Sequence, residues 1–432
     1  MNKPELLTFI REHDVKFVRL QFTDILGVSK NIAVTPEQLE RASDAGIPFD
    51  ASSIAGFSDI AHSDLLLRPV EDTIRILPWR PQSGRVARLM CDICHASGEP
   101  FEGDVRAVLH RVEEQARALG LELQVGPECE FYLFKTDEGG APTTEPLDRA
   151  GYFDIAPLDA GENVRRDICL SLEDMGFEIE ASHHEQGPGQ NEIDFRYSDA
   201  LTAADNLITF KSAVKTIAQR NGMFASFLPK PIQQASGSGL HINLSALKDG
   251  KNAFCEGGEM SPVAKQFLAG VLRHAREFTA LTNPLVNSYK RLAAGMGAPR
   301  SLSWGTQNRS ALVRVPAVGD EQIRLELRSP DPACNPYLAF AAICGAGLAG
   351  IREELTLPSP LGDSSYAMQA SASDRLPENL GEAVTEFRAS ALMREVLGER
   401  IFGFYSEQKQ QEWEEYSRTV HTWELARYLP TI

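Results

Sequence analysis

The sequence predicts an α+β fold in which a small mixed domain precedes a larger one. Segments that alternate apolar and polar residues, as half-buried strands do, are interspersed with segments of helical periodicity along the chain. The chain has 432 residues, which exceeds one typical domain, and 43% of them are hydrophobic, which is enough for a substantial core. We therefore expect two domains, over residues 1–100 and 101–432.

The first domain is predicted to contain two helices and four strands. Residues 4–13 have an amphipathic helical pattern, and Thr35 and Pro36 supply an N-cap and a first-turn proline for a helix over 37–45. The strands are expected at residues 16–22, 29–34, 73–79 and 86–93. Residues 49–57 match no regular period, and a polar segment with Asp50 between apolar anchors is usually a turn.

The second domain alternates longer helices with strands. Its helices are expected at residues 104–119, 164–175, 202–221, 261–281 and 338–351. Its strands are expected at residues 121–134, 177–185, 191–197, 240–245 and 324–328. The apolar run 338–351 is shorter than the roughly 20 residues that a membrane span needs, so it is predicted to be a tightly packed internal helix.

Charge and cysteine content narrow the function classes. The net charge is −17, which argues against nucleic acid or an anionic membrane as a partner, since both are polyanions. Seven cysteines and the lack of a signal-peptide core in residues 1–5 favour a cytoplasmic location. Cys91 and Cys94 have CxxC spacing but no second pair, so we interpret them as structural.

A strand near the start of the second domain carries two glutamates. Glu128 and Glu130 follow Gly126-Pro127, and in a strand they lie on the same face, about 7 Å apart. Two carboxylates that point to the same side of a strand are either solvated surface charges or ligands of a bound group. This stretch alone does not decide between them.

Further acidic residues and one histidine lie on or beside other predicted strands. Glu185 and Glu192 lie at the two ends of a Gly/Pro loop that joins two predicted strands. His241 follows a glycine-rich loop, and Glu326 alternates with leucines in its strand. A lone strand histidine is more often structural than a ligand. Several carboxylates with a single imidazole favour Mg²⁺ or Mn²⁺ over zinc.

Arginines accompany these carboxylates along the second half of the chain. They are Arg291, Arg309, Arg314, Arg324 and Arg328. Arginine suits bidentate contacts with carboxylate and phosphate groups. Carboxylates for metal and arginines for anions, without a Walker-type glycine loop, indicate a phosphoryl-transfer site built on a sheet.

Seven motifs together resemble the glutamine synthetase family, bacterial type I. They include Gly-Pro-Glu-Cys-Glu-Phe at 126–131, Gly-Gln-Asn-Glu at 189–192, Gly-Ser-Gly-Leu-His at 237–241 and Asn-Arg-Ser at 308–310, with segments 49–54, 287–292 and 326–332. The resemblance implies an N-terminal β-grasp domain and a catalytic domain with a distorted antiparallel β-barrel flanked by helices. It also implies a homododecamer of two hexameric rings with active sites between subunits.

The resemblance also assigns roles to individual residues. One metal would be held by Glu130, Glu185 and Glu192, and another by Glu128, His241 and Glu326, with two or three Mg²⁺ or Mn²⁺ ions per site. Asp50 and Arg309 would be catalytic, and the substrate contacts would be Ser53, Tyr152, Gly237, Arg291, Arg309 and Arg328. Nucleotide contacts would be Glu180, Phe195, Arg196, Tyr197, Asn243, Ser245, Arg314 and Arg324.

The implied reaction joins ammonia to the γ-carboxylate of L-glutamate at the expense of ATP, through γ-glutamyl phosphate. One departure is Gly297, which stands where the family's flap has a glutamate, in Gly295-Met296-Gly297-Ala298-Pro299. The loss of that carboxylate weakens attraction for ammonium and leaves room for a larger group. A γ-glutamyl-amine ligase that uses a small alkylamine, and a non-catalytic relative, therefore remain alternatives.

Overall fold

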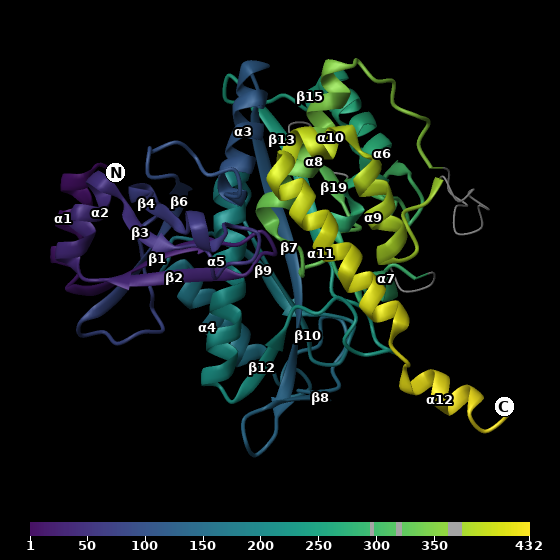
Figure 1. Ribbon diagram of the computed structural model, residues 1–432. Helices are drawn as coiled ribbons and strands as arrows, with labels where there is room; N and C mark the ends of the chain where they lie inside the picture. Colours follow the sequence, from purple (N-terminus) through teal and green to yellow (C-terminus); the bar gives the residue numbers. More distant parts are fainter. Residues whose placement is uncertain (294–297, 317–321, 362–373) are drawn as a thin grey trace.

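The N-terminal part of the chain forms a six-stranded sheet in the computed structural model, which describes residues 1–293, 298–316, 322–361 and 374–432 (Figure 1). The strands are β1 (Val15–Thr23), β2 (Ser29–Val34), β3 (Ile47–Asp50), β4 (Asp64–Pro69), β5 (Arg75–Ile76) and β6 (Arg85–Cys94). Their order is β2-β1-β6-β4-β3, with β5 beside β6, and only β1 and β6 run parallel. Two helices, α1 (Lys3–Glu12) and α2 (Pro36–Ala45), accompany this sheet.

Two predictions for this domain were wrong in detail. The strand expected at 73–79 is reduced to Arg75–Ile76, because a helical turn occupies Glu71–Thr73 and Pro78 cannot donate to a sheet ladder. The segment expected to be a turn from residue 49 begins inside β3, which pairs with β4. Four residues that include Pro48 are too few to show a period of two.

The larger part of the chain is built around a curled, almost entirely antiparallel sheet of eleven strands. The strands are β7 (Glu122–Thr136), β8 (Pro142–Pro146), β9 (Ile179–His184), β10 (Gln190–Phe195), β11 (Ser198–Asp199), β12 (Met223–Ser226), β13 (Leu240–Lys248), β14 (Lys251–Asn252), β17 (Trp304–Thr306), β18 (Val313–Val315) and β19 (Leu325–Leu327). The main order is β17-β18-β19-β13-β7-β10-β9. The long strand β7 pairs with β8, β10, β11, β12 and β13, so it is the centre of the domain.

Helices gather against this sheet and against one another. They are α3 (Val105–Ala118), α4 (Glu162–Glu173), α5 (Ala200–Arg220), α6 (Pro262–Thr282), α7 (Ser288–Arg291), α8 (Pro336–Arg352), α9 (Leu380–Ala389), α10 (Ala391–Leu397), α11 (Glu399–Arg418) and α12 (Thr422–Tyr428). A two-stranded hairpin, β15 (Cys255–Glu256) and β16 (Glu259–Met260), precedes α6. Helix α12 projects away from the rest of the molecule at the C-terminal end (Figure 1).

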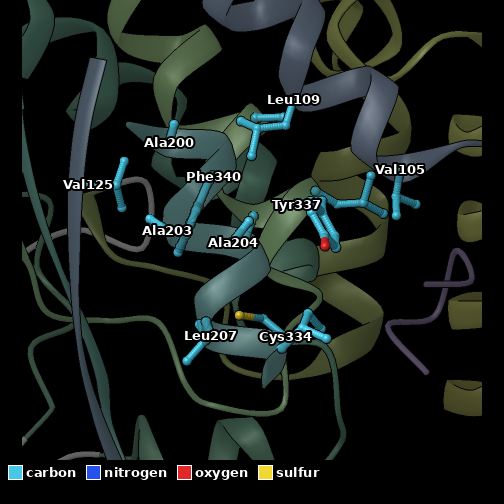
Figure 2. Close-up of a cluster of buried hydrophobic side chains, with 14 of the residues drawn as sticks. Val105, Leu109, Val125, Ala200, Ala203, Ala204, Leu207, Cys334, Tyr337 and Phe340 are labelled. Carbon is cyan, nitrogen blue, oxygen red and sulfur yellow. The ribbon is translucent and has the colours of Figure 1, made fainter. Parts of the chain in front are cut away.

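The core confirms the prediction of a packed internal helix. Helix α8 is buried on every face from Pro336 to Gly350. Its small residues allow α6 to approach closely, since a Cβ at Gly350 would lie 2.2 Å from the carbonyl oxygen of Gln266 in α6. Figure 2 shows side chains of α3, α5, α8 and β7 meeting in one apolar cluster. Among the described residues, no helix has the length and apolar character needed to cross a membrane.

A buried polar network joins the two parts of the chain. We call it the interdomain network, and it consists of Arg88, Asp92, Arg106, Asp205, Thr209 and Tyr337. Arg106 in α3 donates to Asp92 in β6 at 2.6 Å. It also donates to both carboxylate oxygens of Asp205 in α5, from Nε to Oδ1 at 3.2 Å and from Nη2 to Oδ2 at 3.1 Å. The Tyr337 hydroxyl also donates to Asp205, at 2.7 Å. The first domain is therefore held against α3 and α5 by charged hydrogen bonds.

Candidate active site

The strand register of the large sheet brings the predicted ligands to one face. Glu128 in β7 lies opposite Asp194 in β10 and opposite His241 in β13, while Glu130 lies opposite Glu192. Asn243 in β13 lies opposite Glu326 in β19. Side chains directly opposite on neighbouring strands point to the same side of a sheet. The register thus explains why segments far apart in sequence share one site.

Except for Asn243, these side chains line a pocket of about 280 Å³. All six predicted metal ligands line it, namely Glu128, Glu130, Glu185, Glu192, His241 and Glu326. Four of the predicted arginines line it too, which are Arg291, Arg309, Arg314 and Arg328, together with Tyr152 and Gly237. The pocket therefore combines acidic groups with cationic groups in a small volume.

Possible ligand atoms form three overlapping groups in this pocket. Glu128, His241 and Glu326 offer atoms that all lie within 4.8 Å of one another, which is the grouping implied for one metal. Glu130, Glu185 and Glu192, implied for the other metal, do not form a single group. Instead, Glu192 groups with Glu130 and His241 and also, separately, with His183 and Glu185.

The carboxylates of this cluster perturb one another. Burial and the neighbouring Glu130 raise the pKa of Glu192, and burial likewise raises the pKa of Glu130, with Glu185 adding to it. Burial and the charge of Glu128 raise the pKa of Asp194 to about 8. The buried Oδ1 of Asp194 has no hydrogen-bond partner among the described residues. Repelling carboxylates with an unpartnered oxygen fit a hard divalent cation.

Glu128 is an exception within the cluster. Burial would raise its pKa, but hydrogen bonds from His241 and Asn243 outweigh burial and hold the pKa at about 2. Asn243 donates to Glu128 at 2.8 Å and accepts from Arg324 at 2.9 Å. Arg324 therefore acts on Glu128 through Asn243 and does not itself line the pocket.

The arginines have different local partners. Arg314 and Arg328 both form ion pairs with the buried Glu326. Arg291 is buried and donates to the backbone carbonyls of Ser329 at 2.6 Å and Pro330 at 3.0 Å. It also packs under the glycine loop, because a Cβ at Gly237 would lie 2.8 Å from its Cγ. Arg309 is exposed at the edge of the pocket.

Comparison with known proteins gives a consistent family. Residues 14–96 match the β-grasp domain of glutamine synthetase, and residues 102–428 match its catalytic domain. The glutamine synthetase of Clostridium saccharobutylicum is 53% identical over 435 residues, which cover 99% of this chain and 98% of that protein. The enzyme of Thermus thermophilus is 51% identical, with 99% of both chains covered.

The chain belongs to the glutamine synthetase family.

Solved structures agree with this family. The ADP complex of GmaS superposes with a TM-score of 0.89 at 34% identity, covering 98% of this chain and 99% of that one. The glutamine synthetase of Plasmodium falciparum, at 24% identity and a TM-score of 0.88, supports the fold alone. The predicted α+β class, with a β-grasp domain followed by a catalytic domain, is therefore confirmed for this glutamine synthetase family member.

Several residues implied by the family lie away from this pocket. Asp50 is exposed at the end of β3, where hydrogen bonds from the Ser52 side chain and backbone lower its pKa. Asp50 and Ser53 are not among the described residues that line the pocket. In this glutamine synthetase family member, one chain by itself does not bring them to the carboxylates.

The implied nucleotide contacts also lie outside the pocket lining, except for Arg314. Glu180, Arg196 and Tyr197 have exposed side chains. Phe195 is buried against Phe177 and Phe210, so only its backbone is open to a ligand. The Ser245 hydroxyl donates to Asn252 at 3.1 Å.

Sequence reasoning missed other lining residues, which are His183, Gln186, Gln190, Asp194, Ser236 and Ala298. Asp194 could have been found, because it lies two residues after Glu192 in a strand and therefore shares its face. His183 could have been found in the same way, because it lies two residues before Glu185 and shares its face, whereas His184 faces the other side. The flap residues Gly295, Met296 and Gly297 lie outside the described residues.

Proposed function

We propose that this protein catalyses the ATP-dependent ligation of ammonia to the γ-carboxylate of L-glutamate, releasing ADP and phosphate. The observation that carries the proposal is one pocket in which six predicted metal ligands meet four arginines. It is supported by full-length identity of about half to enzymes named glutamine synthetase. The alkylamine and non-catalytic alternatives are not favoured by these relatives.

In the first step the glutamate γ-carboxylate attacks the terminal phosphorus of ATP, forming γ-glutamyl phosphate and releasing ADP. Both reactants are anions, so the site must hold them together against their repulsion. Arg309 and Arg328 both line the pocket, and we assign them to bind carboxylate and phosphoryl oxygens. Gly237 lets the loop pack closely on Arg291, because a Cβ there would lie 2.6 Å from the carbonyl oxygen of Pro229 and 2.8 Å from Arg291 Cγ.

The carboxylate cluster would hold two or three Mg²⁺ or Mn²⁺ ions. When bound, these ions neutralise phosphate charge and polarise the phosphoryl group. The ligand atoms of Glu128, His241 and Glu326 lie close enough together to hold one ion. Glu192 lies close to Glu130 in one group of possible ligands and close to Glu185 in another. The carboxylates thus orient the ions, while the arginines contact the anionic substrates directly.

In the second step an ammonium ion loses a proton and the resulting ammonia displaces phosphate from the acyl carbon. We assign the role of proton acceptor to Asp50 of a neighbouring subunit, with assistance from Ser53. The low pKa of Asp50 keeps this carboxylate ionised and attractive to a cation. Tyr152 and Glu185, at the pocket of the receiving chain, would complete the ammonium site.

We further propose a homo-oligomer, a dodecamer of two hexameric rings, that acts in the cytoplasm. The position of Asp50 and Ser53 outside their own chain's pocket supports shared sites. Helix α12 projects from the body with Trp423 63% exposed and Leu425 49% exposed. Apolar side chains on a projecting helix support burial against another chain. No disulfide is present among the described residues, which suits a reducing compartment.

The experiment is phosphate release from ATP with glutamate plus either ammonium or a panel of small alkylamines. We expect turnover with ammonium that requires glutamate and Mg²⁺ or Mn²⁺. Turnover with amines alone would contradict glutamine synthesis and support the alkylamine ligase. No turnover with any acceptor, in a protein that binds neither metal nor ATP, would support the non-catalytic relative.

A further inference from the structure

Gln190 lies at the centre of the pocket wall and has no assigned role. It is the first residue of β10, lies opposite Tyr132 in β7 and is completely buried. It is uncharged, so it cannot neutralise a substrate or replace a carboxylate ligand. Its contacts, however, reach three separate parts of the site.

The Gln190 amide makes three hydrogen bonds of good geometry. Its Nε2 donates to Glu130 Oε2 at 2.7 Å and to the carbonyl oxygen of Gly237 at 3.1 Å, and its Oε1 accepts from the backbone N–H of Gly187 at 2.9 Å. The Tyr132 hydroxyl lies 3.4 Å from Oε1, but its single proton is donated to the carbonyl oxygen of Ser236 at 2.6 Å. The carbonyl and the ionised carboxylate can only accept, and the backbone N–H can only donate, so a single amide orientation satisfies all three bonds.

These partners belong to elements with different roles. Glu130 is a candidate metal ligand, Gly237 belongs to the glycine loop at the candidate glutamate site, and Gly187 lies in the loop that follows Glu185. The Gly187 loop is in tight contact with the amide, because a Cβ at Gly187 would lie 2.7 Å from Gln190 Oε1. Movement of any one partner therefore changes the position of the others.

Glu130 is tied to the glycine loop a second time. Its Oε2 also accepts from the backbone N–H of Gly239 at 2.8 Å. Two donors on one oxygen set the plane of the carboxylate, and both donors move with the glycine loop or with Gln190. Ligand carboxylates are commonly held by such outer hydrogen bonds, and their loss weakens metal affinity.

We propose that Gln190 is a positioning residue that couples metal binding at Glu130 to glutamate binding at the Gly237 loop. The inference rests on the proposed function, because it takes glutamate as the ligand of that loop. A metal that holds Glu130 in place holds the loop in its binding conformation, and glutamate does the same for Glu130. Such coupling is reciprocal, so each ligand tightens the other by the same factor.

The test is a calorimetric titration of Mg²⁺ or Mn²⁺ into the full-length protein, with and without saturating glutamate and without ATP or ammonium. In the unsubstituted protein we expect glutamate to tighten metal binding by about fivefold or more. Gln190→Met keeps an unbranched side chain of similar length but removes all three hydrogen bonds. We expect its metal Kd to rise by about 10- to 100-fold and its coupling factor to fall well below that of the unsubstituted protein, with a remainder carried by the bond from the Gly239 N–H to Glu130.

Tyr132→Phe is the matched control. It removes a buried hydroxyl that contacts both Gln190 and the carbonyl oxygen of Ser236, but leaves the bonds from Gln190 to Glu130 and Gly237. We expect this variant to retain the coupling. Should Gln190→Met not fold, Gln190→Glu keeps the acceptor toward Gly187 and removes the donor toward Glu130, and the same loss of coupling is expected.

Two results would overturn the inference. One is a coupling factor in the Gln190 variants equal to that of the unsubstituted protein. The other is an equal loss in Tyr132→Phe, which would indicate general loosening of the wall. These binding measurements use neither ATP nor ammonium, so they stand even if ammonium-dependent turnover is absent. That absence would contradict the proposed function and leave the metal–glutamate coupling to be judged separately.

Discussion

The pocket and the interdomain network are two clusters of buried charge with opposite designs. In the interdomain network, each carboxylate oxygen of Asp205 accepts hydrogen bonds from Arg106, and Tyr337 adds another. In the pocket, Glu192 lies among carboxylates that raise its pKa, and Asp194 keeps a buried oxygen without a partner. The interdomain network pairs opposite charges within the chain, although the buried Nε of Arg88 has no partner among the described residues, while the pocket gathers like charges that need a cation.

The difference shows that some buried charges stabilise the fold, while others serve to bind a ligand. A paired, hydrogen-bonded charge stabilises the fold, because removing one partner leaves the other uncompensated. A group of like charges opposes folding and is relieved by a metal ion. Substitutions in the two clusters should therefore separate stability from activity, and the following predictions test that separation.

The largest effect is expected for Asp205→Ala in the interdomain network. Arg106 would lose its two-point partner and the Tyr337 hydroxyl its acceptor, so the free energy of unfolding should fall by about 3–5 kcal/mol. Urea denaturation measures this change. The metal Kd should stay as in the unsubstituted protein, and a change in metal affinity without a loss of stability would contradict the division.

The matched substitution in the pocket is Glu192→Gln. It removes a charge that its neighbours already disfavour, so urea denaturation without metal should show unchanged or higher stability. Ammonium-dependent turnover should fall at least about a hundredfold, which corresponds to about 3 kcal/mol of lost metal-assisted stabilisation. A variant that is both active and less stable would show that Glu192 stabilises the fold, as the charges of the interdomain network do.

Metal addition should stabilise the protein through the pocket alone. At a concentration about a hundredfold above its Kd, Mg²⁺ or Mn²⁺ should add about 2.7 kcal/mol to the free energy of unfolding. Thermal unfolding with and without chelator measures this. We expect the same increment in Asp205→Asn, and a smaller one in Glu192→Gln, which keeps the group of Glu128, His241 and Glu326.

The smallest effect is a dependence of metal affinity on pH. The pKa of Asp194 is raised to about 8 and that of Glu192 is raised as well, so these groups hold protons that ordinary carboxyl groups would have lost. Metal requires the ionised forms and must displace those protons. Affinity should therefore rise from pH 6 to pH 8, by up to about tenfold per unit for each proton released. Calorimetry in buffers of different ionisation enthalpy measures the release, and a flat profile would contradict the raised pKa values.

Much of the site could be predicted from the sequence because its residues lie on strands. The alternation in a strand placed Glu128 and Glu130 on one face, and both line the pocket. That they serve two different metals stays a prediction. His241 alone has no feature that distinguishes it from other strand histidines, and only the motifs taken together predict it as a ligand. In the structure it lies opposite Glu128.

The rest depends on contacts between distant segments. Strand register decides which residues are neighbours, and it placed Asp194 beside Glu128. The importance of Gln190 comes from three hydrogen-bond partners, of which two lie in other segments and one lies across a turn, and an uncharged glutamine is not distinguished by the sequence. Short strands such as β3 were hidden for a different reason, since four residues cannot show a period.

The place of β7 at the centre of the large sheet has a consequence for synthesis on the ribosome. Strand β7 pairs with β13, which pairs in turn with β19, so the site is complete only when Glu326 has been made. At ordinary translation rates, the roughly 200 residues between Glu128 and Glu326 take about 10–40 s. During that time the nascent chain presents unpaired strand edges, which are templates for aggregation. A message truncated before codon 325 should therefore yield insoluble protein and not a folded, inactive subunit.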